Sequence, residues 1–169
     1  DEAREKLRNG MQIMIREGSC AKNLNDILPL VSSKNSRKFS FVSDDRHPSD
    51  LIEEGHINFM VRSAIKSGLD PITAIQIATI NTADYFGLSE IGAISPGKKA
   101  DLIIFDDFKN FNIKHVMVDG RFVVKNGRLT EKIHEEKIKL PNSFFVGNIN
   151  IKLIAPKLKI PKRKNSKSS

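Results

Sequence analysis

The sequence predicts an α/β fold in which parallel strands are joined by helices, followed by a small β portion. Two observations carry this prediction. The first 42 residues alternate as helix, strand, helix and strand, an order typical of parallel strands with helical crossovers. Near residue 90, helical spacing of apolar residues gives way to turn signals and short apolar runs. We therefore place a boundary near residue 90.

The opening segment predicts two helices and two strands. Residues 3–9 have helical composition, and Gly10 stands where a helix commonly ends. Residues 11–16 are rich in apolar side chains and predict a buried strand. Residues 21–30 predict the second helix, and residues 39–42 predict the second strand.

The middle of the chain predicts a series of helices. Ser49 or Asp50 is expected to cap the first, with Glu53 as the reciprocal partner of a capping box. Apolar residues then recur at helical spacing up to Gly68; they are Ile57, Met60, Val61, Ala64 and Ile65.

A second helical segment is predicted after Asp70, which caps a helix that has Pro71 in its first turn. Its apolar side is expected to consist of Ile72, Ile75 and Ala78. A break at residues 79–83 then predicts a short helix through Phe86.

The β portion is predicted from its turns. Residues 95–97, Ser-Pro-Gly, form a tight turn, and residues 102–105 form a strand. Residues 116–118 and 121–124 flank the pair Asp119-Gly120, which predicts a two-residue hairpin turn. Asn126-Gly127 predicts another turn.

The net charge of +8 is unevenly distributed along the chain. Nine of the 28 basic residues follow Glu136, which is the last acidic residue, so the preceding part carries 19 basic and 20 acidic groups. The basic segment also lacks a dense set of aromatic residues for base stacking. We therefore expect no nucleic-acid partner for the folded body.

Cysteine usage and the absence of apolar spans predict a cytoplasmic protein. Cys20 is the only cysteine, which excludes an internal disulfide and a multi-cysteine zinc site. No apolar run approaches the about 20 residues that span a bilayer, so no membrane partner is expected. The first residues are charged and do not resemble a signal peptide. The missing initiator methionine predicts a chain cut from something longer.

Two carboxylates, Asp44 and Asp45, directly follow the predicted strand at residues 39–42. In an α/β barrel the carboxyl ends of the strands form the active-site face. A carboxylate there can bind a metal or transfer a proton. Helix capping or ordering of the loop is the alternative role.

Five sequence blocks resemble the adenine deaminases of the amidohydrolase superfamily, over residues 2–128. They are Arg16-Glu17-Gly18-Ser19, Ser43-Asp44-Asp45-Arg46-His47-Pro48, Glu53-Glu54-Gly55-His56-Ile57, residues 78–88 and residues 92–102. The last two blocks are shared by many amidohydrolases. The Asp-Asp-Arg-His-Pro and Glu-Glu-Gly-His blocks are the ones that indicate adenine.

The resemblance implies the last βα units of a metal-dependent (β/α)8 barrel followed by a small β-sandwich portion. Residues 1–90 would belong to the barrel, residues 91–130 to the sandwich, and residues 131–169 to a basic linker or tail leading to a further domain. Asp44 would follow the eighth strand and bind a divalent metal (manganese, iron or zinc). The other ligands, a His-x-His pair, a glutamate and two histidines, would lie upstream of Asp1.

The activity implied is hydrolytic deamination of adenine, in purine salvage or adenine catabolism, to hypoxanthine and ammonia. A metal-activated hydroxide would attack the base, and Asp44 would carry the proton. The substrate would be the free base, the full-length parent a homo-oligomer, and the isolated fragment inactive.

Five further residues are candidates for substrate contact or for support of the site: Asp45, His47, Glu17, Ser19 and His56. Each has an ordinary structural alternative. Asp45 could cap a helix, His47 could be loop polarity before a proline, and His56 could be a surface histidine.

Two alternative functions stay open. Another cyclic-amide or amidine hydrolase of the superfamily, such as an imidazolonepropionase-like or dihydroorotase-like enzyme, would share residues 92–102 but not the Glu-Glu-Gly-His block. The second alternative is a non-catalytic β module with a basic tail that binds a partner.

Overall fold

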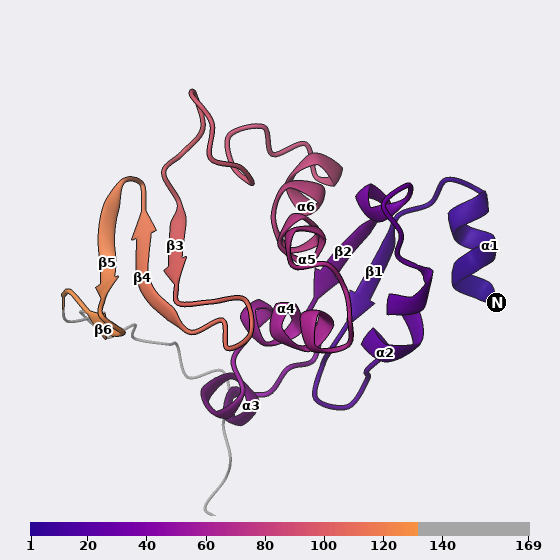
Figure 1. Ribbon diagram of the computed structural model, residues 1–169, viewed down its shortest axis with the longest axis horizontal. Coiled ribbons are helices and arrows are strands. Elements are labelled where there is room, and N and C mark those ends of the chain that lie inside the picture. The colour runs from indigo at the N-terminus through magenta and orange to yellow at the C-terminus, as the bar shows by residue number, and fades with distance from the viewer. Residues whose placement is uncertain (132–169) are drawn as a thin grey trace, which may run out of the picture. The chain divides into compact units, whose positions relative to one another are not determined.

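The computed structural model describes residues 1–131, and its first sheet is a parallel pair of strands. Strand β1 (Ile13–Arg16) pairs with β2 (Phe39–Val42), with Ile13 opposite Phe39 and Arg16 opposite Val42. The two strands lie side by side in Figure 1. The predicted parallel arrangement is confirmed, and the second strand has the predicted bounds.

The helix before β1 has the predicted length, shifted by one residue, and the helix between the strands is shorter than predicted. Helix α1 (Glu2–Arg8) precedes β1, and helix α2 (Leu24–Ile27) is followed by the 3-10 turn η1 (Leu28–Leu30). The predicted helix at 21–30 therefore begins late. Residues 17–22 instead form a tight turn in which the Gly18 N–H donates to the Ala21 carbonyl at 3.0 Å. A second 3-10 turn, η2 (Ser36–Lys38), leads into β2.

The prediction that Ser49 or Asp50 caps the next helix is wrong. Helix α3 (Pro48–Glu53) begins at the proline, with His47 at the N-cap and no side-chain cap. Helix α4 (Ile57–Lys66) is separate from α3, because Gly55 has a φ of 107° that a continuous helix cannot include. The apolar stripe of α4 is buried as predicted at Met60, Val61 and Ala64.

Helix α5 (Pro71–Ala78) follows the predicted cap, since the Asp70 carboxylate accepts from the Thr73 N–H at 2.8 Å. Its apolar side is displaced from the prediction. Ala74 and Ile77 are the buried residues, whereas Ile72 is exposed. Helix α6 (Ile80–Tyr85) begins within the predicted break at residues 79–83, so the interruption between α5 and α6 is confined to Thr79.

Both parallel strands, helices α4 and α5 and residues of the α2 segment contribute to one hydrophobic core. The buried residues are Ile13, Ile15, Leu24, Leu28, Phe39, Phe41, Met60, Val61, Ala64, Ala74, Ile77 and Phe111. Phe111 comes from the link between two later strands and stacks on Phe105, with ring centroids 4.2 Å apart.

A four-stranded antiparallel sheet follows, in chain order. It contains β3 (Leu102–Phe105), β4 (Ile113–Val118), β5 (Arg121–Lys125) and β6 (Arg128–Leu129). Asp119-Gly120 and Asn126-Gly127 form its two tight turns with positive φ at all four residues, which confirms the predicted hairpins.

Two further expectations concern the basic tail and membrane-spanning helices. The predicted basic tail lies, from residue 132 onward, outside the described residues. Within residues 1–131, no helix is both long and apolar enough to cross a membrane.

Candidate functional site

The loop at residues 43–47 follows the carboxyl end of β2, which lies beside the carboxyl end of β1. Because the two strands are parallel, Arg16 at the end of β1 lies close to Asp44. The Arg16 guanidinium donates to Asp44 Oδ2 at 2.7 Å, and the Asp44 side chain is 49% exposed. Asp44 has a left-handed backbone, with φ 49°, which is uncommon for a residue other than glycine. The loop thus presents Asp44 as an accessible carboxylate beside a fixed cation.

Asp45 faces the turn that follows β1. Its Oδ2 accepts from the Cys20 N–H at 3.1 Å, and this hydrogen bond lowers the pKa of Asp45 from its usual value. Its Oδ1 is buried without a hydrogen-bond partner within residues 1–131. A Cβ at Gly18 would lie 1.7 Å from Oδ1, so any larger residue there would displace the Asp45 side chain. Asp45 therefore orders the turn after β1.

Ser19 connects that turn to the start of helix α3. Its hydroxyl accepts from the His47 N–H at 2.8 Å and donates to the Asp50 carboxylate. The contact of His47 is made by its backbone, while the residue itself is exposed. The structure therefore brings Ser19 and His47 together.

Glu17 and His56 make contacts on either side of the loop. Glu17 is 8% exposed, and its Oε1 accepts from the Leu24 N–H at 3.2 Å, which caps the start of α2. His56 lies 2.8 Å from Ser43, measured between Nε2 and Oγ. His56 thus contacts the first residue of the loop.

Sequence reasoning missed Arg46, whose side chain is 2% exposed and pairs with Glu54. It also missed Arg16. The available signal was the position of these residues: Arg46 directly follows the two aspartates, and Arg16 ends an apolar strand. Position along the chain does not predict the pairing, because Arg46 pairs with Glu54 and Asp44 pairs with Arg16.

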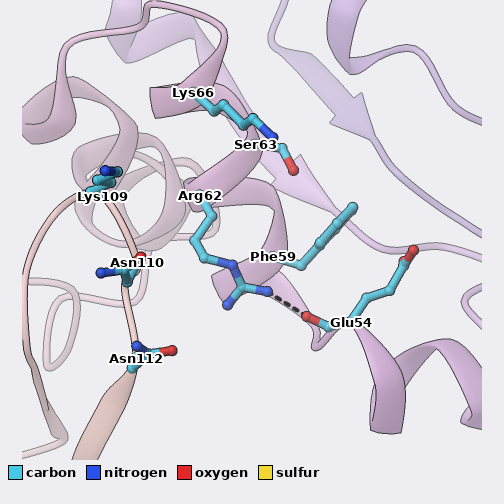
Figure 2. A pocket seen from close by; sticks show the side chains of 8 residues that line it. All are labelled: Glu54, Phe59, Arg62, Ser63, Lys66, Lys109, Asn110 and Asn112. Carbon is cyan, nitrogen blue, oxygen red and sulfur yellow. Dashed lines mark hydrogen bonds between the residues drawn. The ribbon is translucent and has the colours of Figure 1, made fainter.

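A separate cavity of about 430 Å³ lies between helix α4 and the β3–β4 link. Figure 2 shows Arg62 and Lys66 on α4 and Lys109 on the link, with Arg62 donating to the Glu54 carbonyl at 2.5 Å. The six residues predicted for the site do not line this cavity. The loop after β2 and the cavity are thus different features.

The positions of the potential metal-binding side chains show whether the described residues could hold a metal ion. Among residues 1–131, no group of three or more His, Cys, Asp or Glu side chains is placed to hold a metal ion. Asp44 fits the role of a single ligand, because it is accessible and Arg16 contacts only its Oδ2. Glu17 does not fit, since its carboxylate is buried against α2.

The family model described as the amidohydrolase family matches residues 3–123. The chain belongs to the amidohydrolase family. Among amidohydrolases, it is 53% identical to the adenine deaminase of Thermosipho africanus (strain TCF52B) over 89% of this chain and 26% of that protein. It is 50% identical to the adenine deaminase of Kosmotoga olearia over 83% of this chain and 24% of that protein. The chain thus spans about a quarter of the length of these relatives.

Two solved structures have a similar fold. A β-aspartyl dipeptidase from Fervidobacterium islandicum matches 79% of this chain and 36% of its own, with a TM-score of 0.64 and 24% identity. An enamidase of the amidohydrolase superfamily matches 75% of this chain and 37% of its own, with a TM-score of 0.58 and 23% identity. At these identities the likeness concerns the fold alone.

Proposed function

We propose that this chain is the C-terminal part of the catalytic barrel of an adenine deaminase together with the small β portion that follows it. Such an enzyme converts adenine and water to hypoxanthine and ammonia. The observation that carries the proposal is the identity of about 50% to several adenine deaminases over most of the chain. Because the chain spans a quarter of those proteins, the activity belongs to a longer enzyme.

In this proposal, β1 and β2 are the seventh and eighth strands of a (β/α)8 barrel, within residues 1–90. Their parallel pairing and the helices that follow support it. Residues 91–130 then belong to a small β-sandwich, and residues 131–169 form a basic connection to a further domain. The four-stranded antiparallel sheet supports the second assignment.

Asp44 would be the ligand that this chain contributes to a divalent metal (manganese, iron or zinc), with the other ligands outside the chain. When bound, such a metal lowers the pKa of water so that a nucleophile exists at neutral pH. The carboxylate of Asp44 would accept one proton of the attacking water and pass it to the ring nitrogen of adenine. The remaining hydroxyl proton would move to the amino group, which leaves as ammonia as the C6 carbonyl forms. Arg16 holds the Asp44 carboxylate in place through Oδ2.

Four further residues are proposed to position the loop that carries Asp44: Asp45, Ser19, His47 and His56. Asp45 holds the turn after β1, and Ser19 holds the backbone at His47. These contacts limit the movement of Asp44 relative to β1. Preorganised catalytic groups of this kind avoid reorganisation during the reaction.

A substrate panel on the full-length enzyme tests the proposal. Ammonia release from adenine is measured beside other purines and beside cyclic amides such as dihydroorotate, with manganese, iron(II) or zinc added. We expect adenine to be turned over with the highest kcat/KM. Preferential hydrolysis of a cyclic amide would assign the chain to another branch of the family.

A further inference from the structure

Arg46 is a buried cation with a partner for each part of its guanidinium. Its Nε donates to the Gly55 carbonyl at 2.8 Å, and one Nη donates to the Glu17 carbonyl at 3.3 Å. The other Nη pairs with the Glu54 carboxylate. The guanidinium carbon also lies 4.5 Å from the centre of the Phe59 ring. Burial of a charge is costly without such partners, so this geometry is specific.

The partners of Arg46 belong to three different segments. Glu17 follows β1, Glu54 and Gly55 form the junction between α3 and α4, and Phe59 lies on α4. Arg46 itself lies two residues after Asp44 in the loop that follows β2. It therefore ties the chain that carries the proposed metal ligand to its surroundings.

Gly55, whose carbonyl accepts from Arg46, has a backbone conformation and surroundings that favour glycine. Its φ of 107° is available to glycine, and a Cβ there would lie 2.7 Å from Asn58 Oδ1. A second contact joins the same two segments, because His56 Nε2 lies 2.8 Å from Ser43 Oγ. The Glu-Glu-Gly-His block thus meets the block at residues 43–48 at two points.

We propose that these two blocks form a single clasp, in which Arg46 and Glu54 are positioning residues that hold Asp44 in its working orientation. The inference rests on the proposed function, since that function gives Asp44 its role. Asp44 has a left-handed backbone, a conformation that persists at a residue other than glycine where its surroundings enforce it. The buried arginine two residues later supplies that constraint.

The test uses two variants of the full-length enzyme. Arg46→Lys keeps the charge and removes the planar fork, and Glu54→Gln keeps the size and removes the charge. Lys99→Gln is the control, because it removes an exposed ion pair, Lys99 with Glu90 at 3.3 Å, far along the chain from the loop. Changes in the residues that support a metal ligand typically lower metal affinity or activity by about 10–100-fold.

We expect both variants to lower kcat and metal affinity, measured by chelator competition, by about 10–100-fold, with KM for adenine changed less than about twofold. The control should match the wild type. A folded Glu54→Gln enzyme with wild-type kcat and metal affinity would overturn the proposal. If Arg46→Lys does not fold, Glu54→Gln decides, since it retains the carbonyl acceptors at Glu17 and Gly55.

Hydrogen exchange of residues 43–47, measured without substrate, separates this proposal from the proposed reaction. Faster exchange in Glu54→Gln than in the control would support the clasp even in an enzyme that does not deaminate adenine. Exchange equal to that of the control would contradict the clasp, whatever the substrate proves to be.

Discussion

Asp44 and Asp45 are adjacent in the sequence and yet have different surroundings. Asp44 is half exposed beside Arg16, whereas Asp45 accepts from the Cys20 N–H and lies against Gly18. The sequence predicts that carboxylates follow the strand, because the apolar run stops there. It does not predict which carboxylate is accessible, because that depends on the left-handed φ of Asp44 and on a turn 25 residues earlier.

Replacement of Gly18 by alanine tests the contact with Asp45. The new methyl group would lie 1.7 Å from Oδ1, so Asp45 must move. We expect Gly18→Ala to lower the stability of the full-length enzyme by about 1–3 kcal/mol, as for overpacking, measured by urea unfolding.

A double-mutant cycle provides the control for this prediction. In an Asp45→Ala background the contact with Asp45 Oδ1 is absent. Gly18→Ala should therefore lower the free energy of unfolding much less in that background. An equal cost in both backgrounds would show that the strain comes from elsewhere in the turn.

At the scale of elements, local patterns predict the strands and the cap of α5, and they fail where a tertiary contact decides. Strand β2 has the predicted bounds, because its apolar run is short and sharply ended. The break between α3 and α4 was not predicted; it lies at Gly55, which has a φ of 107° and whose carbonyl accepts from Arg46. The exposure of Ile72 shows that α5 turns another side towards the core.

The cap of α5 predicts a pH effect on stability. The Thr73 N–H and hydroxyl donate to the Asp70 carboxylate and lower the pKa of Asp70. A depressed folded-state pKa contributes stability that is present above the unfolded value of about 3.9 and is lost as the pH falls through the folded value.

Asp70→Asn is the matched variant, because asparagine caps helices about as well and does not titrate. The thermal midpoint of the wild type minus that of Asp70→Asn should decrease between pH 6 and pH 3. A difference that stays constant over this range would show that the ionised carboxylate adds nothing to the cap.

At the scale of the whole molecule, the chain carries one proposed metal ligand and lacks the rest of the set within residues 1–131. The alternation of elements predicts parallel strands, and the pairing of β1 with β2 confirms it. The closed barrel cannot be predicted from two strands, because closure depends on strands beyond the single parallel pair that residues 1–131 contain. The assignment to a barrel therefore relies on the resemblance and stays a proposal.

The isolated 169-residue chain should release no ammonia from adenine. One carboxylate ligand cannot hold a divalent metal in a catalytic geometry, which commonly needs three or more protein ligands. The assay is ammonia release with added metal, with the full-length enzyme as the positive control. Turnover by the purified chain would mean that a complete site forms within it.

The central claim is that Asp44 carries the proton and binds the metal, and Asp44→Asn in the full-length enzyme tests it most directly. The substitution keeps the size of the side chain and removes its charge and its ability to accept a proton. Asp84→Asn, at an exposed position on α6, is the matched control. We expect kcat for adenine to fall by about 10²–10⁴-fold in Asp44→Asn, with an unchanged fold, and to stay at the wild-type value in the control. A loss of less than about tenfold would contradict the account, because general acid–base groups contribute more than that, and would make Asp44 a structural residue.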